Sequence, residues 1–166
     1  MASPVPDPNR EAVERADALL RATQEQVIDD PTVFVKGAAL GTLTTLELAK
    51  LANARAQDPA VRRFAVDLGR SQQSLRTKLA TIAGRKRLDV TGTLVFQDEE
   101  MLKEGATLAG ADFDSWFLRQ ANAELLKSVG LFEAASRMKD REFAAFAQDS
   151  LPVLEASRKS VTALVR

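Results

Sequence analysis

Carboxylates and hydroxyls are the side chains with which this sequence could do chemistry, because its 166 residues include neither histidine nor cysteine. Without cysteine there is no disulfide, no thiolate nucleophile and no metal site with sulfur ligands. Without histidine the commonest general base and metal ligand is missing, so the serines have no evident activating partner. Glycine-rich phosphate-binding motifs and the nucleophile elbow of hydrolases are also missing. These residue types argue against an enzyme.

Glu47 is the carboxylate whose surroundings in the sequence are most apolar. Its neighbours in the predicted helix are Leu43, Leu46, Leu48 and Leu51. Two interpretations stay open. Glu47 either occupies a solvated position beside a wide apolar stripe, or it points inward as a metal or ligand contact, with Glu124 as a second carboxylate.

Three serines occupy seam positions where apolar residues are expected. Ser71 fills a gap in the helical apolar pattern of residues 61–82, and Ser150 and Ser157 lie on the seam of the last predicted helix. Trp116, near Phe113 and Phe117, is expected to be an aromatic plug at one end of the fold, with a cofactor platform as the alternative.

Helix-start signals predict the elements that carry these residues. Asp30 and Asp58 each precede a proline, the pattern of an acidic N-cap followed by Pro at the first helical position. Asp140 is expected to cap the last helix, and Gly84 to end the second one in the left-handed conformation. The predicted core helices are 31–57, 59–83, 112–138 and 141–165.

An additional N-terminal helix is expected within the same single helical-bundle domain, which spans 9–166. Asn9 can cap this helix, which would run to about Ile28 after a flexible leader at 1–8. Its apolar side is narrow, so we expect it to lie against the bundle rather than at its centre. Its apolar residues are Val13, Ala16, Leu19, Leu20 and Val27.

The lengths of the connections predict the topology. Tight turns join the first core helix to the second and the third to the fourth, which makes two antiparallel hairpins. The connection between the second and third helices is long enough to run the length of the bundle, and Asp98 is expected to cap a short helix within it that reaches Leu108. The predicted fold is all-α, a ferritin-like antiparallel four-helix bundle with one long crossover.

Charge is balanced overall, with 23 basic and 23 acidic residues, but it is unevenly distributed. Residues 55–87 carry nine basic side chains against two acidic ones, and residues 88–115 carry seven acidic side chains against one lysine. The basic segment is either an anion-binding face or is neutralised by an acidic crossover packed near it. We favour the second interpretation and expect no nucleic-acid partner.

Several segments, in order and spacing, resemble a bacterial family, the domain of unknown function four-one-four-two (DUF4142), whose members are often labelled predicted outer membrane proteins. The resemblance covers about residues 31–165. It rests on segments 34–39, 46–52, 58–65, 111–114, 129–135 and 146–155. It implies a ferritin-like bundle that is usually exported and has no established activity.

The resemblance also implies a metal constellation that this chain has lost. Family members typically carry histidines at the positions of Ser71, Leu125 and Ser157, together with the glutamate that is present here as Glu47. Three histidines and a glutamate converging in a bundle would be a plausible metal site. Two hydroxyls, one apolar side chain and a lone carboxylate make a poor one, so we expect a degenerate site with no metal and no cofactor.

The expected function is therefore that of a non-catalytic helical bundle of the bacterial envelope, acting through its surface, as a homo-oligomer or on a protein partner. The expected location is periplasmic or otherwise exported, with the cytoplasm as the alternative. The sequence shows no secretory signal and no apolar run of about 18 residues that could span a membrane. The alternatives are a ferritin-like metal-binding or oxidase protein that uses carboxylates, and a carrier of a small apolar ligand in a cavity lined by Leu125 beside Ser71 and Ser157.

Overall fold

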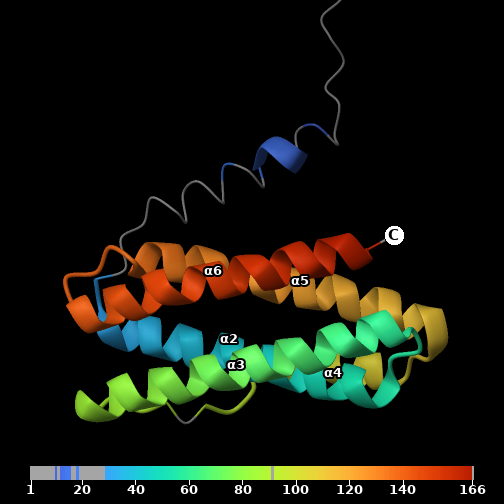
Figure 1. Cartoon of the computed structure of the whole chain (residues 1–166), viewed down its shortest axis with the longest axis horizontal. Helices are drawn as coiled ribbons and strands as arrows, with labels where there is room; N and C mark the ends of the chain where they lie inside the picture. The colour runs from blue at the N-terminus through green and yellow to red at the C-terminus, as the bar shows by residue number, and fades with distance from the viewer. Residues whose placement is uncertain (1–9, 11, 16–17, 19–28, 91, 166) are drawn as a thin grey trace, which may run out of the picture.

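The computed structural model describes residues 10, 12–15, 18, 29–90 and 92–165, and within residues 29–165 the regular structure is helical. The helices are α2 (Pro31–Arg55), α3 (Pro59–Arg85), α4 (Phe96–Ala106), α5 (Gly110–Ala135) and α6 (Arg141–Leu164), labelled as in Figure 1. The all-α prediction is confirmed, and the four long helices agree with the predicted core helices to within three residues at each end. The predicted leader lies outside the described residues. Of the additional helix, residues 10, 12–15 and 18 are described, and they are helical.

Two hairpins, α2–α3 and α5–α6, form two layers of the bundle (Figure 1). The start of α2 lies at the end of α5, where the rings of Phe34 and Phe132 meet edge to face at 5.3 Å. The end of α3 lies at the start of α6, where Lys86 Nζ is 3.0 Å from Asp140 Oδ2. Neighbouring helices therefore run antiparallel, and α3 and α5 run in the same direction on opposite sides of the core.

The cap predictions are confirmed for three helices. Asp30 accepts a hydrogen bond from the Thr32 N–H at 2.9 Å, Asp58 from the Ala60 N–H at 2.8 Å, and Asp140 from the N–H groups of residues 142 and 143. These bonds satisfy N–H groups that have no partner within the helix.

The prediction for Gly84 was wrong, because α3 continues through Arg85 and the left-handed residue is Arg87, at φ 58°. The N–H groups of Arg87 and Leu88 bond back to the carbonyls of Gly84 and Ala83, which is the Schellman pattern of a helix C-terminus. Leu88 packs against the hydrophobic core. Because of this contact, the turn that ends α3 lies after Arg85 and not at Gly84.

The long connection contains α4, which packs against α2 and α5. Asp98 was predicted to cap this helix, but Val95 occupies the N-cap position and α4 begins at Phe96. Asp98 lies in the first turn of α4, and its carboxylate accepts a hydrogen bond from Thr44 Oγ1 of α2 at 3.0 Å. The carboxylate therefore joins the connection to the bundle.

Trp116 is almost fully buried beneath α4, next to the ring of Phe113 at 5.6 Å. A Cβ atom on Gly105 of α4 would lie 2.1 Å from the Trp116 ring, so α4 can come this close only with glycine at that position. The turn between α2 and α3 is fixed at the same end of the bundle. There the buried Asp114 accepts hydrogen bonds from the N–H groups of Gln57 and Asp58 at 2.9 and 2.8 Å.

Candidate ligand groove

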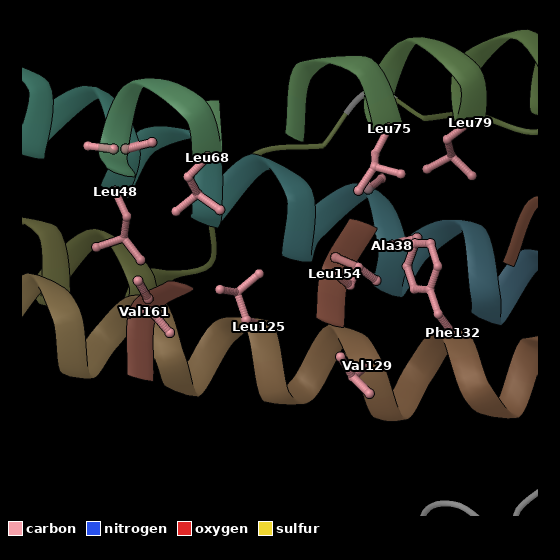
Figure 2. Packing of buried hydrophobic residues seen from close by; sticks show 14 of the residues in the cluster. Ala38, Leu48, Leu68, Leu75, Leu79, Leu125, Val129, Phe132, Leu154 and Val161 are labelled. Atoms are coloured by element: carbon pink, nitrogen blue, oxygen red, sulfur yellow. The ribbon is translucent and has the colours of Figure 1, made fainter. Parts of the chain in front are cut away.

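Around Leu125, near the middle of α5, the core of the bundle is apolar, although Gln72 of α3 is also fully buried. Leu125 of α5 is fully buried, and Figure 2 shows it pointing toward Leu68 of α3, on the other side of the core. Leu48 of α2 and Val161 of α6 belong to the same buried cluster. Side chains of this kind offer no donor atom to a cation.

The two carboxylates considered as metal ligands each pair with a lysine of their own helix. Glu47 is partly exposed, and its Oε1 lies 3.1 Å from Lys50 Nζ. Glu124 is mostly buried, with Oε1 2.8 Å from Lys127 Nζ. Across the described part of the chain, no group of three or more Asp, Glu, His or Cys side chains lies close enough to hold a metal ion. For Glu47, the partial exposure and the pairing with Lys50 correspond to the first interpretation, a solvated position beside the apolar stripe.

Ser71 and Ser157 lie together in an elongated hollow between α3 and α6, which we call the α3–α6 groove. It consists of two adjoining hollows of about 760 and 710 Å³ that share Ser71 and Val153. The first extends toward the start of α3 and the end of α6, and the second toward Ile82 and Glu142 at the other end. The prediction of a cavity lined by Leu125 was wrong, because the Leu125 side chain is packed in the core and does not line either hollow.

The groove has an apolar base and polar rims. Phe64, Leu68, Leu75 and Phe146 line its base. Arg63, Asp67, Lys78 and Asp149 are exposed and lie along the rims. Groups of both signs therefore border the apolar surface, an arrangement that suits an amphipathic or an apolar occupant more than an anion.

The serines of the groove donate hydrogen bonds to the backbone of their own helices. Ser71 Oγ donates to the Leu68 carbonyl at 3.0 Å and Ser157 Oγ donates to the Val153 carbonyl at 3.2 Å. Ser150, which is buried, donates to the Phe146 carbonyl in the same way. Each hydroxyl proton is thus used by the backbone of its own helix. What the serines supply is space and hydrogen-bond acceptors.

The family pattern described as "Domain of unknown function (DUF4142)" matches residues 16–164. The chain belongs to this family. No curated protein matches it. The prediction of family membership made from the sequence is therefore confirmed, and the DUF4142 match begins inside the N-terminal segment that precedes α2.

Two solved structures of another family, DUF305, share the fold of this DUF4142 protein. A DUF305 fragment from Deinococcus radiodurans is 16% identical, with a TM-score of 0.74 over 84% of this chain and 97% of that one. A DUF305 protein from Streptomyces coelicolor, described as a predicted secreted protein, is 15% identical, with a TM-score of 0.70 over 82% of this chain and 91% of that one. At such identities the likeness shows a common helical-bundle fold.

The basic residues of α3 have partners in several parts of the bundle. Arg62 and Arg76 donate to the backbone carbonyls of Ala56 and Ala39, while Arg85 and Lys86 pair with carboxylates at the start of α6. The expected neutralisation by the acidic crossover is only partly correct. Val90, early in the connection, lies beside α3, but the acidic helix α4 packs on α2 and α5 instead.

One ion-pair cluster closes the end of the bundle where α3 meets α6. The hydrogen bond and charge of Asp140 raise the pKa of Lys86 above its ordinary value. The hydrogen bond from Arg85 lowers the pKa of Glu142. Burial opposes the charged form of Asp140, but the bonds from Lys86 and two backbone N–H groups outweigh it, so its pKa is lowered.

No helix of the described residues is long and apolar enough to cross a membrane.

Proposed function

We propose that this DUF4142 protein is a non-catalytic helical bundle of the bacterial envelope that acts through its surface or through oligomer contacts. The observation that supports the proposal most directly is the apolar centre around Leu125, because a ferritin-like oxidase or metal store needs ligands there. Two hairpins joined by one long connection give the bundle ferritin-like connectivity, but the ligand positions of the resemblance carry serine, leucine and a lysine-paired glutamate. An exported location is consistent with the DUF305 structure from Streptomyces coelicolor, which is described as that of a predicted secreted protein.

Metal analysis of protein purified without chelators tests this proposal. The expected result is iron, manganese and zinc well below one equivalent, unchanged by Glu47→Ala. Glu155→Ala is a matched control, because it removes an exposed glutamate that also pairs within its own helix. Stoichiometric metal that is lost in Glu47→Ala and kept in the control would overturn the proposal in favour of the carboxylate-based metal protein. Sedimentation of the same sample gives the oligomeric state.

The α3–α6 groove favours a second candidate function, the binding of a small apolar ligand. Its base is aromatic and aliphatic, and Val153 on its wall is 40% exposed. Apolar dyes that bind with one site and raise the melting temperature would support the carrier function. Loss of dye binding in Val153→Glu, but not in Val33→Glu at an exposed position of α2 outside the groove, would place the ligand in this groove.

A further inference from the structure

The α3–α6 groove is one apolar surface that is open in the described part of the chain. A second apolar face is predicted for residues 9–28, of which residues 10, 12–15 and 18 are described as helical, with Val13 60% exposed. Arg10 and Glu14 of this segment pair at 3.0 Å across one helical turn. Apolar residues at 13, 16, 20 and 27 follow steps of three, four and seven, which define one face of a helix.

The attachment point of the segment lies at one end of the groove. Asp29, directly after the segment, accepts a hydrogen bond from the Lys139 N–H at 3.3 Å, and its carboxylate is also 3.3 Å from Lys139 Nζ. Lys139 comes just before α6, whose residue Glu142 lines the adjacent end of the groove. The point at which the segment joins the bundle is therefore next to the groove, so that docking there needs no long linker.

The segment and the groove also match in length. Twenty residues of helix span about 30 Å at 1.5 Å per residue. The helix α6, which forms one wall, has 24 residues and spans about 36 Å by the same rise. A helix over residues 9–28 would thus cover most of the groove, running antiparallel to α6 and parallel to α3.

Charges on the two surfaces are complementary in this orientation. If Ile28 lies level with Ile82 and Glu142, counting back along the helices places Arg21 level with Asp149 and Glu25 next to Lys78. Asp149 and Lys78 are both exposed groove residues. Val13 and Ala16 fall in the part of the groove around Ser71, Val153 and Ser157, where the small serine side chains leave room for them.

We propose that residues 9–28 dock as an amphipathic helix in the α3–α6 groove of the same chain and cover its apolar base. An apolar ligand or a partner helix that binds the groove must displace the segment. This inference goes beyond the proposed function and does not depend on whether the protein binds metal.

Introduced cysteine pairs test the docking cleanly, because the chain has no cysteine of its own. Ala16→Cys combined with Val153→Cys in the full chain should form an intramolecular disulfide under mild oxidation. The rate should exceed by about tenfold that of Ala16→Cys with Ala123→Cys, an exposed position on α5 outside the groove. Non-reducing gels and mass spectrometry distinguish intramolecular from intermolecular products.

A charge exchange sharpens the test. In the Ala16/Val153 cysteine pair, Lys78→Glu should slow disulfide formation, and adding Glu25→Lys should restore it. Equal rates for the groove pair and the α5 pair would overturn the proposal. A disulfide that forms only between two chains would also overturn it and would show that the groove binds the segment of a second copy. If the two cysteine pairs form disulfides at equal rates and an apolar dye nevertheless binds the protein, the result would favour the small-ligand carrier instead.

Discussion

The two hairpins of the bundle meet along two seams, α2–α5 and α3–α6, which differ in how closely their helices pack. On the α2–α5 side, a Cβ atom on Gly37 would lie 3.1 Å from Leu131, and one on Gly41 would lie 3.5 Å from Ser128 Oγ. On the α3–α6 side, the facing small residues include serines, and a groove of two adjoining hollows remains. Small side chains thus have opposite consequences on the two sides. Glycine lets the helices approach closely, whereas the serines line a hollow.

The long connection increases this difference. Helix α4 covers α2 and α5 and is joined to them by Thr44, Asp98 and the Gly105–Trp116 contact. The α3–α6 side has ion pairs at one end, between Arg85 and Lys86 of α3 and carboxylates of α6. The α2–α5 seam is therefore closely packed and covered by α4, whereas the α3–α6 seam leaves an open groove.

The largest effect that tests this comparison is expected at Phe34. This ring is fully buried and meets Phe132, Phe143 and Phe146 edge to face. Phe34→Ala should lower the free energy of unfolding by about 3–5 kcal/mol, as measured by urea denaturation. Ile82→Ala in the groove should lower the free energy of unfolding by roughly 1 kcal/mol, because Ile82 is only partly buried and less buried apolar area is lost. Equal losses would mean that the two seams do not differ in packing.

An intermediate effect is expected where α4 docks. Gly105→Ala should destabilise the protein by about 1–3 kcal/mol, because the new methyl group overlaps the Trp116 ring and forces α4 or the indole to move. Gly84→Ala is the control, since nothing lies within 4 Å of a Cβ atom there. In the control, helix propensity should raise stability by roughly 0.5–1 kcal/mol. Thermal melts of both variants check the prediction, and stabilisation by Gly105→Ala would show that α4 is not held against α5.

The smallest effect is expected at the ion pairs of the groove end. Because the pKa values of Asp140 and Glu142 are lowered, their stabilisation is present above the ordinary carboxyl pKa near 4 and is lost as the pH falls through the lowered values. Stability should therefore decline between about pH 5 and pH 2. The raised pKa of Lys86 acts at the other limit, so its stabilisation is lost only as the pH rises above about 10.

Asp140→Asn isolates this contribution because asparagine still caps α6 but cannot pair with Lys86 as an anion. The variant should be less stable than the parent at pH 7, and the difference should shrink as the pH falls to 3. Asp58→Asn makes the same chemical change at the cap of α3, at the opposite end of the bundle. A loss of equal size and pH dependence in both variants would show that Lys86 contributes nothing measurable.

Local signals in the sequence predicted the helices well. The Asp-Pro pairs and Asp140 set helix starts through contacts within a few residues, and apolar periodicity identified buried residues such as Leu125 and Phe143. The same reasoning failed at Gly84 and Asp98. There the outcome depended on distant partners, since Leu88 packs into the core and Asp98 bonds to Thr44 of another helix.

The sequence by itself determined that this protein is helical, that it lacks imidazole and thiol chemistry, and that it belongs with DUF4142, because composition, caps and periodicity are properties of the chain alone. Only the tertiary structure decided that Ser71 and Ser157 line one groove while Leu125 lies in the core, and that Asp114 holds a turn more than fifty residues away. The physical reason is that a side chain's role depends on which other helix it faces. Packing across the whole bundle sets that choice, and spacing along one helix does not.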